Sequence, residues 1–285
     1  MAIQLILAPL TGGKRDALTL ASAFAAAEPL KAHVRALFVR PDPTETLPFF
    51  GDDMAPTIAA EIVDTAREAA DAASASAQAS LNAAAAAAEF ETVENAAPGP
   101  TASFVEMKGH FTDCIVRASQ LSDLIVFGPL KEGDRPGFTE AFEAALIKTR
   151  CPVLLGSEAE HGSFARVAIG WNGSAESSHA VSAALPYLVR ARSVQILTVQ
   201  NTSNGGGDVE ALQAYLRVHG VEAGVIRVDA QTRTVGDVLL ETALANEADL
   251  LVIGGYGHSR LREWFSGGVT RRILSQATLP LFLVH

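Results

Sequence analysis

The fold of this 285-residue chain is decided by two segments, "IQLILAPLTGGKRDALTLASAFA" (residues 3–25) and "FARVAIGWNGSAESSHAVSAALPYL" (residues 164–188). Each begins with an apolar run typical of a β-strand, passes through a turn of small residues, and continues into an Ala- and Leu-rich stretch with helical periodicity. Because the same order occurs twice, the sequence indicates an internal repeat.

Three further pairs of segments extend the repeat along the chain. The pairs are 34–39 with 194–199, 114–130 with 238–256, and 149–156 with 277–284. Each half is therefore predicted to alternate five strands with four helices. The short polar segment 157–163 separates the two units, so we expect a first half at 1–156 and a second half at 164–285.

The first half is the longer one because it carries an insertion-like segment at about 44–101, which is rich in alanine through residue 88. Alanine is the strongest helix former. Glycine is absent from 55–88, and proline occurs there only at Pro56. These features favour a long helix with a narrow, closely packed face over a flexible linker.

Strands that alternate with helices pair in parallel through right-handed crossovers, which predicts a doubly wound α/β sheet in each half. Ligands of such sheets bind beyond the carboxyl ends of the strands. In the second half the loops at that edge are residues 170–174, after the first strand, and residues 254–257, after the fourth.

The second of these loops opens the glycine-rich stretch "GGYGHSRLREWFSGGVT" (254–270). Glycine permits a close approach of backbone to a ligand. Gly267 and Gly268 lead into a helical pattern, and a helix start offers unpaired N–H groups together with the positive end of the helix dipole. The stretch is therefore predicted to cradle phosphate through main-chain donors.

The spacing Gly254-x2-Gly257-x9-Gly267 resembles the ATP-binding signature of the universal stress protein family. The resemblance covers both halves, as in tandem members. It implies an adenine nucleotide α-hydrolase-like fold with strand order 3-2-1-4-5 in each half, and halves that associate through their last strands as an intrachain pseudodimer. Two residues depart from the family pattern: Gly268 replaces a Ser or Thr, and Asn172 replaces an Asp.

By this resemblance Val199 would lie near the adenine and Ile253 would line the pocket. Trp171 covers the base or is a core aromatic; His258 and Arg260 contact phosphate or lie in a solvated loop. The full set expected to bind the cofactor is Trp171, Asn172, Val199, Ile253, Gly254, Gly257, His258, Arg260, Gly267, Gly268, Val269 and Thr270.

The first half lacks this signature. Pro129, Leu130 and Lys131 stand at the positions of Gly255, Tyr256 and Gly257, and Glu140 falls at the place of the second glycine pair, where it would repel phosphate. We therefore expect the first half to be a degenerate domain that does not bind nucleotide.

Composition narrows the choice of partners. The formal net charge of −10 argues against nucleic acid and anionic membranes as partners. The N-terminus lacks the pattern of a signal peptide, which makes a cytoplasmic protein the expectation. Cys114 and Cys151 are expected to be small buried side chains, and the seven histidines lack metal-ligand spacing, so magnesium would enter only with ATP.

Three functions remain open. The first is an ATP-binding stress-response or signalling protein with nucleotide in the second half. The second is a non-binding scaffold of the same fold, and the third is a slow ATPase. No general base is recognisable in the glycine-rich loop, so no catalytic residue is assigned and an enzyme is not expected.

Two other nucleotide-binding motifs do not match. Ala8 and Arg15 stand where a P-loop needs a glycine and a Ser or Thr, and Arg260 stands where the dinucleotide fingerprint needs its last glycine. Homodimerisation of the whole chain stays open.

Overall fold

The computed structural model describes residues 2–42, 56–130, 137–149, 151–158, 164–200, 208–230, 233–255 and 278–285. The described elements of the first half are β1 (Leu5–Leu10), α1 (Asp16–Ala27), η1 (Glu28–Leu30), β2 (His33–Arg40), α2 (Pro56–Ala87), β3 (Glu91–Thr92), β4 (Thr101–Lys108), α3 (Phe111–Ser119), β5 (Leu124–Phe127), α4 (Phe138–Lys148) and β6 (Val153–Leu155). Those of the second half are β7 (Arg166–Gly170), α5 (Ala175–Leu188), β8 (Ser193–Gln200), α6 (Val209–Val218), β9 (Ala223–Asp229), α7 (Val235–Ala245), β10 (Leu250–Gly254) and β11 (Leu281–Val284).

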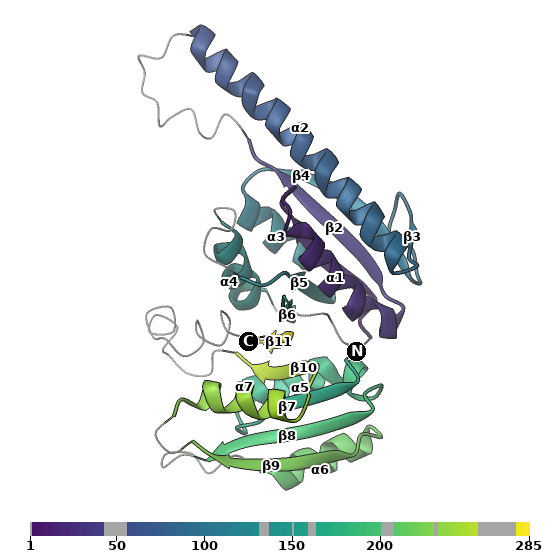
Figure 1. The fold of residues 1–285 in the computed structure, drawn as a ribbon, viewed down its shortest axis with the longest axis vertical. Coiled ribbons are helices and arrows are strands. Elements are labelled where there is room, and N and C mark those ends of the chain that lie inside the picture. Colours follow the sequence, from purple (N-terminus) through teal and green to yellow (C-terminus); the bar gives the residue numbers. More distant parts are fainter. Residues whose placement is uncertain are drawn as a thin grey trace.

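The strands form one sheet with the order β3-β4-β2-β1-β5-β6-β11-β10-β7-β8-β9. Within each half the order is 3-2-1-4-5, with the two-residue β3 added at one edge, and neighbouring strands are parallel. The predicted fold class is confirmed. The halves meet where β6 pairs antiparallel with β11, at the middle of the molecule in Figure 1.

The same anchoring device begins the first strand of each half. The Asp123 carboxylate accepts hydrogen bonds of 2.9 Å from the backbone nitrogens of Gln4 and Leu5. In the second half the Asp249 carboxylate accepts from the backbone nitrogens of Ala165 and Arg166, at 3.1 and 2.8 Å. Each aspartate stands immediately before the strand that pairs with the one it anchors. This correspondence supports a repeat at the level of single hydrogen bonds.

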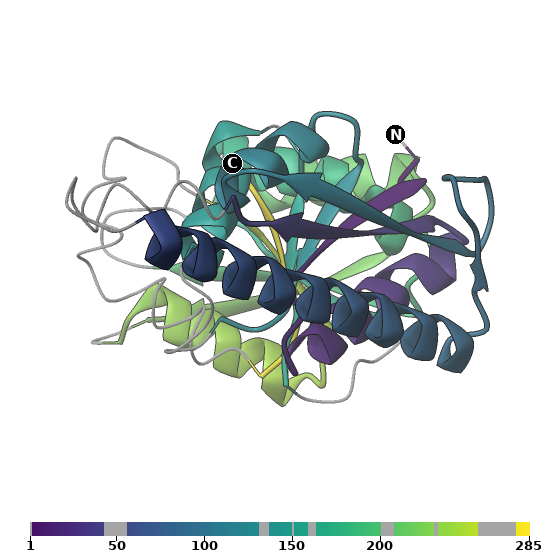
Figure 2. The same ribbon diagram turned by 90° about the horizontal axis from the view of Figure 1, so that it is seen from above.

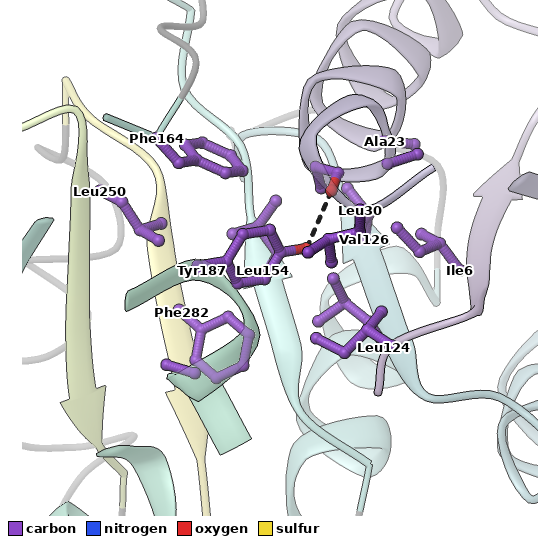
Figure 3. Packing of buried hydrophobic residues seen from close by; sticks show 14 of the residues in the cluster. Ile6, Ala23, Leu30, Leu124, Val126, Leu154, Phe164, Tyr187, Leu250 and Phe282 are labelled. Carbon is purple, nitrogen blue, oxygen red and sulfur yellow. Dashed lines mark hydrogen bonds between the residues drawn. The ribbon is translucent and has the colours of Figure 1, made fainter. Parts of the chain in front are cut away.

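Two apolar cores, one on each face of the sheet, continue across the junction. The first core joins Phe24 and Leu81 of the first half to Tyr187 and Leu212 of the second. In the second core, Phe142 of the first half belongs to the same cluster as residues of α7, β10 and β11. Figure 3 shows Tyr187, Phe164 and Phe282 of the second half facing Leu154 and Val126 of the first. The halves therefore share their interior instead of enclosing two separate ones.

The predicted Ala-rich helix is confirmed as α2, which lies beside α1 in both views (Figures 1 and 2). Most of its buried side chains are alanines, and Ala77 and Ala85 belong to the first core together with Leu81. Alanine lets two backbones approach closely. Arg40, at the end of β2, pairs with Asp71 of α2 at 2.6 Å and with Glu106 of β4 at 2.5 Å. The helix is thus fixed to the sheet by packing and by an ion-pair network.

Candidate functional site

The candidate site lies at the carboxyl edge of the sheet in the second half, where the order of the strands reverses between β7 and β10. These strands pair in parallel, with Ile253 opposite Gly170. The register places the β7–α5 turn beside the first residues of the glycine-rich stretch. It is the position at which open α/β sheets bind their ligands.

The turn after β7 is held by its own side chains. Asn172 Oδ1 accepts a hydrogen bond from the Ser174 backbone nitrogen at 3.0 Å, and Gly173 between them has a φ of +76°. Ser174 is the N-cap of α5, and its hydroxyl accepts from the Ser177 backbone nitrogen at 3.2 Å. Asn172 is exposed. Its carbonyl oxygen therefore shapes the turn, as an aspartate carboxylate would, but without the negative charge.

Gly254 is in contact with the start of α5. A Cβ on this residue would lie 2.4 Å from the Ser177 backbone nitrogen and 2.5 Å from the Glu176 carbonyl carbon, closer than side chains approach. Gly128 meets Thr19 of α1 in the same way, with its hydroxyl oxygen at 2.7 Å. Gly254 is therefore needed to seat the helix on the end of the strand, a packing role shared by both halves.

Gly255 connects the loop to the last strand and to the first half. Its backbone nitrogen donates to the Val284 carbonyl at 2.6 Å, and its own carbonyl oxygen lies 3.3 Å from His285 Nδ1. A Cβ on Gly255 would lie 3.9 Å from the Leu146 side chain of α4. The glycine-rich stretch thus begins against a helix of the opposite half.

Ile253, Val199 and Trp171 do not share one face of the sheet. Ile253 packs against the second core, and its Cγ2 would lie 2.8 Å from a Cβ on Gly170. Val199 is partly buried at the end of β8. Trp171 instead packs against the first core. Its indole nitrogen is buried and has no hydrogen-bond partner in the described part of the chain. This placement favours the interpretation of Trp171 as a core aromatic.

The remaining predicted contacts lie outside the described residues. They are Gly257, His258, Arg260, Gly267, Gly268, Val269 and Thr270, and for the first half Lys131. The structure therefore places Asn172, Ile253 and Gly254 near the ends of the paired strands β7 and β10. The second glycine pair stays a prediction from the sequence.

The corresponding turn of the first half is closed by a residue that the sequence did not single out. The Asp16 carboxylate, which is buried, accepts hydrogen bonds from the Thr11 backbone nitrogen, from the Thr11 hydroxyl and from the Gly12 backbone nitrogen, at 2.9, 2.9 and 2.8 Å. Arg15 donates to the Pro129 carbonyl oxygen. The signal in the sequence was an aspartate at the start of a helix, a position that favours bonds to nearby backbone N–H groups.

Helix α2 covers the same turn. Gly12 has a φ of +78°, and a Cβ there would lie 2.5 Å from the Ala73 carbonyl oxygen. The amide donors of Thr11 and Gly12 are thus already engaged by a carboxylate, and the turn is backed by a helix that has no counterpart in the second half of the described chain. An anion has no donors left to bind at these two positions.

The described residues give little support for a cysteine nucleophile, a metal site or a membrane span. Both cysteines are buried as expected, and burial raises the pKa of the Cys151 thiol to about 12, which keeps it a poor nucleophile at neutral pH. Within the described ranges, no three His, Cys, Asp or Glu side chains are grouped to hold a metal ion. None of the described helices combines the length and apolarity that crossing a bilayer requires.

Comparison with known proteins finds a family model that matches the second half. The profile of the universal stress protein family (Usp) matches residues 163–285. A search of curated proteins finds no match.

Solved structures resemble the whole chain. A universal stress protein from Archaeoglobus fulgidus DSM 4304 superposes with a TM-score of 0.72 at 16% identity, covering 99% of this chain and 97% of that one. A putative universal stress protein from Pseudomonas aeruginosa UCBPP-PA14 gives a TM-score of 0.54 at 15% identity, covering 99% and 93%. At these identities the likeness establishes the fold. A universal stress protein solved in complex with cAMP also matches, with a TM-score of 0.35 and 23% identity over 43% of this chain and 97% of that one.

Proposed function

We propose that residues 163–285, which belong to the universal stress protein family, bind ATP, and that the chain acts as a stress-response or signalling protein rather than as an enzyme. The observation that carries the proposal is the juxtaposition of the β7–α5 turn with the end of β10. Gly254, the first glycine of the spacing typical of phosphate binding, contacts the amino end of α5 there.

The two halves differ at the residues that matter for this proposal. In the first half a carboxylate occupies the amide donors of the first turn, and the chain after β5 reads Gly128-Pro129-Leu130-Lys131. In the second half the turn is held by the neutral Asn172, and the glycines are retained. We therefore assign one nucleotide to each chain, in a second domain at 164–285, and a structural role to a first domain at 1–156.

ATP bound at this site would be connected to the first half through Gly255 and β11. Gly255, the second residue of the glycine-rich stretch, donates a hydrogen bond to Val284 of β11 and lies next to Leu146 of α4. Because β11 is the strand that pairs with β6, a polyphosphate bound next to Gly255 would act close to the junction of the halves. Magnesium would arrive with the nucleotide. We place the protein in the cytoplasm and leave association of whole chains as a second level of signalling.

The competing functions are a scaffold without ligand and a slow ATPase. Thermal unfolding of the full chain with and without Mg-ATP separates binding from scaffolding. At a hundred times its dissociation constant, a ligand specific for the folded state adds about 2.7 kcal/mol of stability. We expect such a gain with Mg-ATP; an unchanged transition at millimolar ATP would favour the scaffold. Release of inorganic phosphate over hours, measured on the same sample, tests the ATPase.

A further inference from the structure

A cavity of about 300 Å³ lies between the halves, at the edge of the sheet opposite the candidate nucleotide site. Ala2, Ile3 and Gln4 line it just before β1 begins. The second half contributes the carboxyl ends of α5 and α6, from Leu185 to Arg190 and at His219. Crossover helices run antiparallel to their strands, so these helix ends lie at the amino edge of the sheet. The N-terminus in Figure 1 marks this side of the junction.

The floor of the cavity is apolar and is built by both halves. Ile3 and Leu30 of the first half are 5% and 8% exposed, and Leu185 of α5 is partly buried. At the opening, Val189 is 48% exposed. Pockets for small molecules are commonly found at domain interfaces, start at roughly 300 Å³, and are lined by apolar side chains with a few polar groups. This cavity meets each of these criteria.

None of the side chains that line the cavity is acidic. Arg190 and His219 are exposed and line the cavity, and Gln4 is uncharged. Arg190 Nη1 donates to the Pro186 carbonyl at 2.9 Å, and no carboxylate within the described residues forms an ion pair with it. Four other arginines of the second half, Arg166, Arg217, Arg227 and Arg233, each pair with a glutamate. In a chain with a net charge of −10, an unpaired guanidinium beside an apolar hollow is a complement for an anion.

We propose that this cavity binds a small amphipathic anion, with an apolar body on Ile3, Leu30 and Leu185 and a carboxylate, sulfonate or phosphate at Arg190. Because such a ligand touches both halves, it stabilises their pairing. The site lies away from the glycine-rich stretch, so this proposal stands or falls independently of ATP binding.

The probe for the test is 8-anilinonaphthalene-1-sulfonate, which combines a naphthalene body with one anionic group and becomes fluorescent in apolar surroundings. It is titrated against the full chain, and Val189→Glu is compared with the matched change Val235→Glu. Both valines are exposed near helix ends, but Val235 at the start of α7 does not line the cavity. We expect Val189→Glu to weaken binding of the probe about tenfold, which corresponds to 1.4 kcal/mol, and Val235→Glu to leave it within twofold.

Two further arms test the charge and the chemical class. Arg190→Gln should weaken the probe several-fold, and octanoate or octyl phosphate should displace it while octanol does not. Whichever of the two anions competes better identifies the preferred head group. Equal probe affinity in Val189→Glu and Val235→Glu, with far-ultraviolet circular dichroism showing both folded, would overturn the site. Equal displacement by octanol and octanoate would overturn the role of the anion. Displacement of the probe by ATP would contradict its separation from the nucleotide site.

Discussion

The Tyr187 hydroxyl of α5 donates a hydrogen bond of 3.0 Å to the Ala26 carbonyl oxygen of α1, and so joins the second half to the first within the shared core (Figure 3). The ring of Tyr187 also contacts those of Phe164 and Phe282, at centroid distances of 5.5 and 6.1 Å. Burial raises the pKa of the Tyr187 hydroxyl, which keeps it a neutral donor. The junction of the halves is thus both apolar and hydrogen-bonded.

Removing this hydroxyl should destabilise the whole chain. Tyr187→Phe leaves a buried carbonyl without its partner, and we expect the free energy of unfolding in urea to fall by about 1–3 kcal/mol. Tyr215→Phe is the control, because Tyr215 is 38% exposed and its hydroxyl lies 3.3 Å from that of Ser182. A loss no larger for Tyr187→Phe than for Tyr215→Phe would show that the bond does not hold the halves together.

The contact between Gly254 and α5 predicts a sharp difference between two neighbouring glycines. Gly254→Ala forces a Cβ to 2.4 Å from the Ser177 backbone nitrogen, and we expect a loss of about 1–3 kcal/mol of stability. Gly255→Ala meets no atom closer than 3.5 Å and should change stability by less than about 0.5 kcal/mol. Chemical denaturation of both variants measures the difference; similar losses would contradict the close approach of α5 to β10.

Asp16 should be a determinant of stability in the first half. Asp16→Ala leaves two backbone N–H groups and one hydroxyl without their hydrogen-bond acceptor in a turn covered by α2. We expect the free energy of unfolding to fall by about 2 kcal/mol. Asp64→Ala is a suitable control because the Asp64 side chain is 69% exposed and its pairing with Arg67 is at the surface. If the two variants unfold at the same denaturant concentration, the turn is not held by Asp16.

His33 predicts a dependence of stability on pH. It is buried, its ring nitrogens lie 2.7 Å from the Thr101 hydroxyl and 2.8 Å from the Ser103 hydroxyl, and its pKa is lowered from 6.5 to about 4, mainly by burial and further by Arg35. Between these values the unfolded chain binds a proton that the folded chain does not. Stability should therefore be full above pH 6.5 and fall by up to about 3 kcal/mol as the pH drops toward 4.

The variant His33→Gln should lose that part of the pH dependence, whatever its effect on stability at pH 7. His179→Gln, at an exposed position of α5, should keep the slope of the wild type. Urea unfolding at intervals from pH 7.5 to 4.5 gives the three slopes. A slope for His33→Gln equal to that of the wild type would exclude His33 as its source.

Much of the fold could be predicted from the sequence because the strands and helices follow from local patterns of residues. The apolar runs and turns of residues 3–25 and 164–188 predict β1, α1, β7 and α5, and the alanines of 55–88 predict α2. The resemblance to the universal stress protein family supplied the strand order and the pairing of last strands, which agree with the sheet.

What escaped prediction depends on contacts between residues far apart in the chain. Ala73 covers Gly12, Tyr187 reaches Ala26, and Leu146 approaches Gly255; no periodicity encodes these pairs. The sequence did not decide whether Trp171 covers the base or packs in the core, because the side of the sheet on which it lies depends on the elements around β7. In the structure it packs against the first core. Asp16 was overlooked because an aspartate at a helix start is commonly a simple cap.

The most direct test of the central claim is the stoichiometry of ATP binding measured by titration calorimetry on the full chain and two variants. The account predicts one nucleotide per chain, lost in Gly257→Val and kept in Lys131→Val, the matched position of the first half. Two nucleotides per chain, or a loss of binding in Lys131→Val alone, would contradict it.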